Sequence, residues 1–512
     1  MDLYNNISDV LSKRNIHLAV GDIYDYMEIW KEWYAGDVAN FHHYNAKLAN
    51  GQTVECERLT MNMPKKVCED MAKLLWTEKT QIKLSSLNAT KKLWAILDNK
   101  VNNFTTNFPI FVEQICALGN GALIEYKENG LTTIDYVTGD LVIPYKYTNS
   151  YIYGLITVSR YSEIDTDSKG KKGKVKYFTH ITYHEYENGK YVKNNELYVS
   201  KTENELGKEV EFNDEFPDVE KHSEVETDVP YFQILKPNLA NNLDMASPSG
   251  IAIIANSIDR FKSIDVKYDS FMNEFILGKK RILVDNSSLK AKAVPNEDGT
   301  IDYVQYFDKN DTVYVAVEGM EKQPAKEIDF KLRAQEHIDS INADLNWLSS
   351  NVGLGNNFYK FDGTTVYKNE QEVMSENSEA FRTRVHHLIN VNDVVYDLVR
   401  AICHIEGIKT TDITIIPDDS IIENKNAEKT VALMEVQQGL KSKKSYLMKY
   451  EGMTEEQAEK ELQAIADEKM TNQEMFGFPT ERTPDDTNAE KKDEKEEKKE
   501  KVNSKKEEEK EE

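Results

Sequence analysis

The sequence predicts an α+β fold in which long helices flank a β-rich region. Apolar residues recur at every third or fourth position in the first and last parts of the chain, the spacing of a helix with one buried face. Between Gly121 and Ser200 the period changes to two, and Tyr, Val and Ile alternate with polar residues. From Thr480 onward Lys and Glu dominate, so only the preceding part is predicted to fold.

The first 110 residues are predicted to be helical. Aromatic residues three and four positions apart mark a helix over Asp22–Asp37, and Pro64 suits the first turn of a helix over Met63–Lys79. The strands that follow are separated by turns at Glu128–Gly130 and Glu187–Gly189, where Asn-Gly favours a tight hairpin. Core packing accounts for the apolar residues of all these segments.

Two long amphipathic helices enclose a small β-rich insertion. Ser247–Pro248 forms an N-cap and first-turn pair for a helix that runs to Gly278. The insertion carries three strand-like runs, at 279–285, 301–308 and 311–318. The helical period returns near Pro324, with Ile328 and Leu332 at its start, and the second helix ends at Gly353 or Gly355.

A third helix is predicted from Asn369 to Glu406, which at about 1.5 Å per residue is on the order of 55 Å long. The run 412–419 is then predicted to be a strand, and two shorter helices are predicted at 427–440 and 453–470. The second and third long helices are joined by a loop with three aromatic residues. Exposed aromatic side chains on a loop are unfavourable for a monomer, so the loop is expected to contact something.

The composition excludes several classes of protein. A net charge of −25 argues against a protein that binds nucleic acid by neutralising phosphates, although not against one that surrounds DNA without holding it. The four cysteines are scattered without a CxxC pair, which is typical of free thiols in a reducing cytoplasm. No signal peptide is expected. The sequence has no apolar run of about 18 residues, so no membrane span is predicted.

The sequence contains no constellation that specifies an active site. His180 and His184 lie in a predicted strand, roughly 13 Å apart at about 3.3 Å per residue, too far to share an ion. No HExxH, Walker, GxSxG or kinase pattern is present. We therefore predict no catalytic residue, no cofactor and no metal site, and the chain is not predicted to be an enzyme.

Three stretches resemble the portal proteins of tailed bacteriophages, of the type found in siphoviruses that infect Gram-positive bacteria. Leu59–Leu84 resembles the family's N-terminal helix and the segment that leads out of it. Val352–Gly363, VGLGNNFYKFDG, is similar to its glycine–aromatic–FDG loop. Asn369–Leu388 resembles the start of its long helix, where the pattern E-V-x-S-E-N-S-x-x-x-R-T is typical. The resemblance covers about residues 1–478, although the central β region matches in arrangement only.

The resemblance implies a portal-type fold assembled as a ring of twelve subunits at one vertex of a phage head. The large subunit of the terminase motor would drive double-stranded DNA through the ring, and DNA would later leave through it. Head-completion, connector and tail proteins would attach there, and the scaffold and major capsid protein are further implied partners. The protein would therefore belong to the virion, after assembly in the host cytoplasm.

The family's parts map onto this chain by position. They are a wing (1–246, with a long wing helix at 369–410), a stem (247–277 and 327–352), a clip (278–326), a tunnel loop (353–368), a helical crown (411–478) and a charged tail (479–512). The tunnel loop would face DNA through Asn356, Asn357, Phe358, Tyr359, Lys360 and Phe361, with hinges at Gly353, Gly355 and Gly363. The clip would pair strands between subunits through Ile282, Leu283, Val284, Val313, Tyr314 and Val315.

Charge supports a conduit, because twelve copies of −25 give about −300 and a duplex slides past walls that repel it. Lys360 could touch the DNA backbone lightly, or it could be a solvated loop lysine. Other classes stay open on the residues alone. The same apolar stripes could be buried within a monomeric bundle, in a non-channel helical scaffold or adaptor of phage head assembly, or in a nucleic-acid enzyme.

Overall fold

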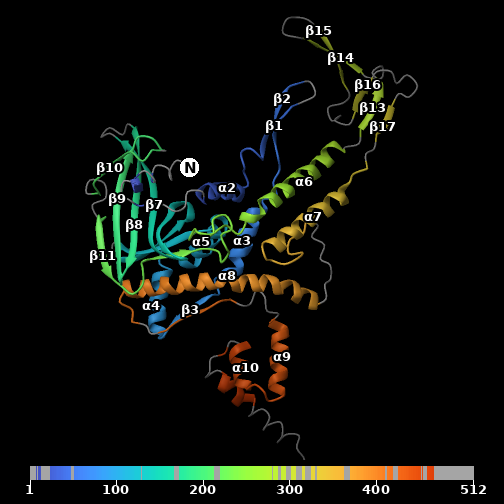
Figure 1. Cartoon of the computed structure of the whole chain (residues 1–512). Helices are drawn as coiled ribbons and strands as arrows, with labels where there is room; N and C mark the ends of the chain where they lie inside the picture. Colours follow the sequence, from blue (N-terminus) through green and yellow to red (C-terminus); the bar gives the residue numbers. More distant parts are fainter. Residues whose placement is uncertain are drawn as a thin grey trace, which may run out of the picture. The chain divides into compact units, whose positions relative to one another are not determined.

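The structure is a computed structural model of the whole chain, shown in Figure 1. It forms two compact units, Met1–Ile422 and Glu423–Glu512. Apart from isolated residues before position 23, the structure describes 23–47, 51–128, 130–166, 172–203, 205–212, 219–278, 281–285, 290–295, 301–306, 314–317, 325–328, 331–361, 370–409, 412–418, 425–450, 453 and 458–465. Gly363, Val313 and the charged tail, for which predictions were made, lie outside these residues.

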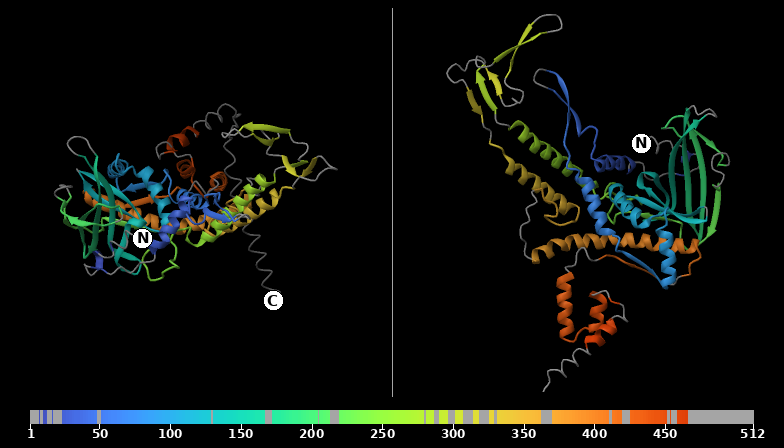
Figure 2. Two further views of the ribbon diagram at one scale, coloured as in Figure 1. Left: turned by 90° about the horizontal axis from the view of Figure 1, so that it is seen from above. Right: turned by 180° about the vertical axis from the view of Figure 1, so that it is seen from behind.

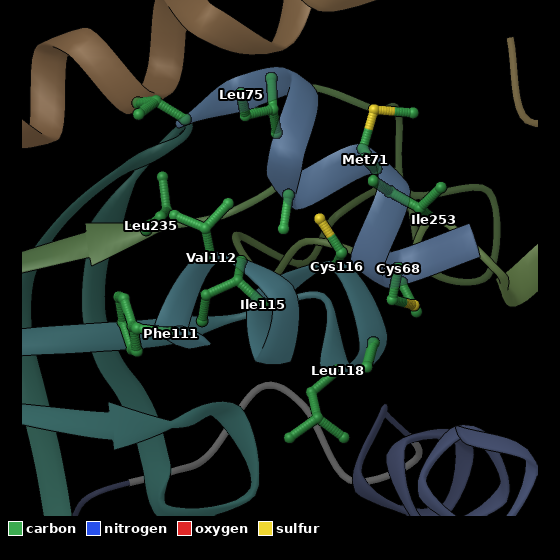
Figure 3. Close-up of a cluster of buried hydrophobic side chains, with 14 of the residues drawn as sticks. Cys68, Met71, Leu75, Phe111, Val112, Ile115, Cys116, Leu118, Leu235 and Ile253 are labelled. Carbon is green, nitrogen blue, oxygen red and sulfur yellow. The ribbon is translucent and has the colours of Figure 1, made fainter. Parts of the chain in front are cut away.

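Four helices build the centre of the region predicted to be the wing: α2 (Ile23–Ala35), α3 (Met63–Leu75), α4 (Leu87–Leu97) and α5 (Phe104–Leu118). The two helices predicted from aromatic spacing and from Pro64 are confirmed as α2 and α3. Helices α3 and α5 pack together, and Figure 3 draws Cys68 and Met71 of α3 with Ile115 and Cys116 of α5 in one cluster of buried side chains. These side chains are all at most 2% exposed, so this contact is the core of the wing.

The prediction that the first 110 residues are entirely helical is wrong. A hairpin of β1 (His43–Lys47) and β2 (Thr53–Glu57) interrupts them, and β3 (Gln81–Leu84) pairs with β18 (Ile413–Ile416) far along the chain. Strands this short carry too few residues for a period of two to stand out. In β3 the partner strand, rather than local propensity, determines the conformation.

The β-rich part of the wing consists of two antiparallel sheets. The larger sheet has the order β10-β9-β8-β7-β6, with β11 also paired to β9, and the smaller has the order β12-β4-β5. Their strands are β4 (Gly121–Glu128), β5 (Leu131–Thr138), β6 (Val142–Thr148), β7 (Tyr151–Thr166), β8 (Lys172–Glu187), β9 (Lys190–Ser200), β10 (Lys208–Val210), β11 (His222–Glu226) and β12 (Phe232–Leu235). The predicted hairpin turn between β8 and β9 is confirmed, with positive φ at Asn188 and Gly189.

The first stem helix, α6 (Ile258–Leu277), begins later than predicted. The Ser247–Pro248 pair does not start it, and residues 249–254 are buried without being helical, before a short 3-10 turn at Ala255–Ser257. The Ile253 amide donates to the Cys116 carbonyl at 2.9 Å, and the Gly250 amide donates to Asn120 Oδ1 at the same distance. These tertiary bonds replace helical ones, so the apolar spacing at Ile251 and Ile254 reflects core packing rather than a helix.

The second stem helix, α7 (Ala334–Asn351), also begins later than predicted. Ile328, expected within it, ends strand β17 (Ala325–Ile328), which pairs with β13 (Arg281–Asp285), while Leu332 precedes the helix. The clip sheet has the order β16-β13-β17, with β16 (Tyr314–Val317) parallel to β13. A separate hairpin joins β14 (Lys290–Pro295) to β15 (Ile301–Tyr306).

The long wing helix α8 (Glu370–Ile405) agrees with the predicted bounds to within one residue at each end. It packs on α3, α4, β4, β12 and β18, and Figure 2 shows it from two further directions. The second unit contains α9 (Lys425–Gln437), α10 (Lys443–Tyr450) and a helical stretch at 458–465. Among the described helices, none has both the length and the apolarity needed to cross a membrane.

Candidate functional site

Helices α6 and α7, the pair predicted to form the stem, are antiparallel and are joined by polar contacts. Asp344 of α7 accepts a hydrogen bond from Ser263 at 2.5 Å and an ion pair from Lys267 at 2.7 Å. Farther along, Glu274 of α6 binds Arg333, which precedes α7. Glu274 follows Ser263 in the chain by the same number of residues by which Arg333 precedes Asp344. This constant offset fixes the register of the two stem helices.

The outer end of the stem is held by an ion pair at the clip boundary. Arg333 binds both oxygens of Glu274, at 3.2 Å from Nε and 2.8 Å from Nη2, in the two-pronged geometry that guanidinium groups favour. The Arg333 hydrogen bonds hold the pKa of Glu274 at about 2, below its usual value. The pair therefore stays charged at neutral pH and ties the start of α7 to the last turn of α6.

The tunnel loop is anchored on one face of α7. The amide of Phe361 donates to Asn342 Oδ1 at 2.8 Å, and the amide of Asn357 donates to Asn346 Oδ1 at 2.6 Å. The amide of Tyr359 donates to Ser349 Oγ at 3.1 Å. Asn342, Asn346 and Ser349 are spaced by four and three, so they share a helix face. Alternate loop amides are thus bound to the stem.

The three loop aromatics have three different environments. Tyr359 is 8% exposed, and burial followed by the carboxylate of Asp70 raises its pKa above the usual range. The ring of Phe361 packs edge-on against Phe271 of α6, with ring centres 5.6 Å apart. Phe358 is 43% exposed. The aromatic cluster therefore contacts its own chain through Tyr359 and Phe361, and of the three it presents mainly Phe358 outward.

The remaining residues of the predicted DNA-facing set divide in the same way. Asn356, Asn357 and Lys360 are exposed, whereas Tyr359 is buried. Gly353 and Gly355 have φ values of 75° and 85°, which glycine adopts without strain. A Cβ on Gly353 would come within 2.5 Å of Thr383 Oγ1, and that hydroxyl donates to the Gly353 carbonyl at 2.6 Å. In this conformation Gly353 is therefore held against α8.

The clip strands pair within the chain. Ile282, Leu283 and Val284 lie in β13, which is bonded by β16 on one side and β17 on the other. The expectation that β13 offers an open edge is wrong, because both of its edges are occupied. Tyr314 and Val315 lie in β16, which with β17 forms the edges of this sheet. Pairing with another subunit would use these outer strands.

The wing helix α8 is fixed to the stem-side core by a buried arginine. Arg384 is 2% exposed; its Nε donates to the Leu74 carbonyl at 2.8 Å and its NH2 donates to the Asp418 carbonyl at 2.9 Å. Leu74 lies in the last turn of α3, where carbonyls lack helical partners and a positive charge is favourable. Neither this contact nor the α7 anchor was predicted, although the spacing of Asn342, Asn346 and Ser349 was visible in the sequence.

No group of three or more potential metal ligands occurs among the described residues. The two histidines singled out in the sequence have other partners: His180 lies 3.0 Å from Asn195 Oδ1, and His184 lies 2.7 Å from the Tyr191 hydroxyl. A cleft of about 690 Å³ adjoins the end of α8 beside Arg400 and His404. Arg400 there is already paired, because Asp228 binds it at 2.7 Å.

The features built most fully in this chain are helix-to-helix and loop-to-helix contacts, which are typical of a structural component. Comparison with protein families identifies it further. The family model "Phage portal protein, SPP1 Gp6-like" matches residues 21–475. The chain therefore belongs to this family of phage portal proteins, and it is a structural protein of phage particles. The expected phage portal family is confirmed, and the match includes α6, α7, α8 and the loop between α7 and α8.

No curated protein matches this chain. Among solved structures, it is similar to a chain from a structure described as the neck of a native GTA particle computed with C12 symmetry. The identity is 10% and the TM-score 0.37, with 75% of this chain and 88% of that chain covered. The family assignment depends on the family model and not on this similarity.

Proposed function

We propose that twelve copies of this chain form a ring at one vertex of a phage head, and that double-stranded DNA passes through its bore. The observation that carries the proposal is the family match over residues 21–475. A ring of identical chains requires an interface that closes on rotation, and two long helices held in a fixed register can provide one. The Ser263–Asp344 and Glu274–Arg333 contacts supply that register.

The charge of the chain supports a role as a conduit. Twelve copies of −25 give about −300 per ring, and a wall of this sign repels the phosphate backbone. Each lysine or arginine contact to a phosphate would add affinity and therefore friction. In the tunnel loop, Phe358 and Lys360 are exposed and would meet the duplex, while Tyr359 supports the loop from within the chain. The loop would act as a collar that limits backward slippage.

The partners follow from position at the vertex. The clip would face the large subunit of the terminase during packaging, and head-completion, connector and tail proteins afterwards. The scaffold and major capsid protein would surround the wing, and the crown would lie inside the head. DNA ejection would reverse the path of packaging. Assembly would take place in the host cytoplasm. The phage would be a siphovirus that infects Gram-positive bacteria.

Negative-stain microscopy and native mass spectrometry of the purified chain test the proposal. Twelve chains of 58.9 kDa predict a ring of about 707 kDa with a central hole. Rods or single globules at every protein concentration would contradict the ring and favour the helical scaffold or adaptor instead. Packaging of DNA by terminase into heads built with the protein then tests the conduit directly.

A further inference from the structure

A second cleft, of about 370 Å³, shares Asp228 and Arg400 with the cleft beside the end of α8. Its walls are formed by α8, by β12 with the residues just before it, and by the start of β7. Three of the side chains that line it are aspartates, namely Asp228, Asp393 and Asp397. We call it the acidic cleft.

The two cationic side chains of the acidic cleft are already bound within the chain. Arg400 pairs with Asp228 at 2.7 Å and with Asp397 at 3.3 Å. The Lys236 ammonium donates to the Pro248 carbonyl at 2.9 Å, and burial lowers the pKa of this lysine. Both cations are therefore committed to partners of their own.

Three aspartates against two cations leave the acidic cleft with an excess of one negative charge. Asp393 is exposed and has no ion-pair partner among the residues that the structure describes. Burial raises the pKa of Asp397, and the nearby charges of Asp393 and Asp228 add to this rise although Arg400 opposes it. The carboxylates that α8 presents to the cleft are therefore short of positive charge.

Behind the acidic cleft lies a buried carboxyl group without a partner. Glu125 of β4 is 1% exposed, and neither of its carboxyl oxygens has a hydrogen-bond partner among the described residues, which is unusual for a buried polar group. Its amide donates to the Tyr231 carbonyl at 3.2 Å, so the register of β12 on β4 puts Glu125, Tyr231 and Gln233 on one face. The Tyr231 hydroxyl lies 2.6 Å from His404 Nδ1 of α8, so this face is turned toward α8.

Two observations direct Glu125 toward the acidic cleft. Gln233, on the same face of the sheet, lines the cleft. Burial raises the pKa of Glu125, and the charge of Asp397, which lines the cleft from α8, adds to this rise. The buried carboxyl group therefore interacts with the same aspartate that the cleft leaves short of positive charge.

Two tyrosine rings also line the acidic cleft. Tyr151 is 56% exposed, and Tyr186 is held by a hydrogen bond from its hydroxyl to the Thr227 carbonyl at 3.3 Å. The face of an aromatic ring attracts cations, and a planar guanidinium can stack on a ring while it binds a carboxylate. Because the described residues include no group of three potential metal ligands, an organic cation suits these carboxylates better than a metal ion.

We propose that the acidic cleft binds an arginine side chain from a basic segment of a partner protein. The guanidinium would pair with Asp393 and lie against Tyr151, and its charge would compensate the carboxyl groups of Asp397 and Glu125. A net charge of −25 attracts basic partners over long distances, and the cleft would give that attraction a defined point of attachment. The cleft lies within a single chain, so the inference does not depend on formation of the ring.

Saturation-transfer NMR of the full chain with small probes provides the first test, because this method detects weak ligands of large proteins. The probes are N-acetyl-arginine amide and its uncharged analogue N-acetyl-citrulline amide. The arginine probe should bind, whereas the citrulline probe has a similar shape but no charge and should not bind. Equal binding of the two probes, or binding of neither, would overturn the proposal.

A charge substitution locates the bound probe. Asp393→Asn should weaken binding of the arginine probe at least about fivefold, because a charge-assisted contact is lost. The matched control is Asp25→Asn, which removes the same charge at an exposed position on α2 and should leave the affinity unchanged. Equal effects of the two substitutions would mean that the probe responds only to the overall charge, and would overturn the proposal.

A ring substitution tests the same site without changing its charge. Tyr151→Ala should weaken binding of the arginine probe about threefold, because the contact between the cation and the ring is lost. Tyr26→Ala, at a residue that is 39% exposed on α2, should have no effect. Equal affinities of these two variants would place the arginine outside the acidic cleft and overturn the proposal.

Discussion

The contact between the tunnel loop and α7 gives a quantitative prediction. Asn342, Asn346 and Ser349 accept hydrogen bonds from three loop amides, and replacing all three with alanine removes the bonds without shortening α7, since alanine is a strong helix former. Each bond stabilises the bound loop by about 1 kcal/mol, so the triple variant should lose about 3 kcal/mol if the sites are independent. This loss raises the open population of the loop by about 100-fold.

Hydrogen exchange measures the change at the atoms concerned. The amides of Asn357, Tyr359 and Phe361 exchange when the loop opens, so their exchange should become about 100-fold faster in the triple variant. Each single substitution should produce about a fivefold effect. The matched control is Ser350→Ala, because Ser350 is exposed next to Ser349. Exchange at the loop amides that the triple substitution leaves unchanged would refute the anchoring role.

Three other predictions concern Phe361, Asp344 and His387, with Val385→Ala as a control. Phe361→Ala removes a ring that packs on α6, and differential scanning calorimetry should show a free energy of unfolding lower by about 2 kcal/mol. This loss is smaller than the loss expected for a fully buried Phe because the ring is only partly buried. Asp344→Ala leaves Lys267 without its carboxylate, so the free energy of unfolding should fall by about 2 kcal/mol. Val385→Ala, on the exposed side of α8, should change the free energy of unfolding little. For His387, burial lowers the pKa to about 4, so its stabilisation is complete above the unfolded pKa of about 6.5 and is lost as the pH falls toward 4. His387→Asn keeps an acceptor for its backbone partner and should flatten the dependence of melting temperature on pH over that interval; an unchanged slope would contradict the assignment.

The sequence predicted most accurately those elements whose own side chains determine them. The bounds of α8 followed from apolar residues that repeat along the whole helix, and the β8–β9 turn followed from Asn188 and Gly189. The portal family was reached through the loop and the start of α8, and the family model confirms it. These features depend on contacts within a few residues or on a repeated period.

The errors occurred where distant partners decide the local structure. Strand β17 is held by β13, more than forty residues earlier in the chain, and the residues around Ile253 are held by Cys116 and Asn120. The tunnel loop was expected to face DNA through residues 356–361, and nothing within the loop itself indicates that its amides bind acceptors on α7. The spacing of Asn342 and Asn346 marks a polar strip, yet only the structure shows that loop amides occupy it.

The contact made by Arg384 also bears on changes to the C-terminal end of the chain. Through its bond to the Asp418 carbonyl, it secures the backbone just before the boundary between the two units at Ile422. An extension or deletion that begins after Ile422 would therefore leave this contact intact. A fluorescent reporter attached after Ile422 would likewise leave the bond between Arg384 and the Asp418 carbonyl in place.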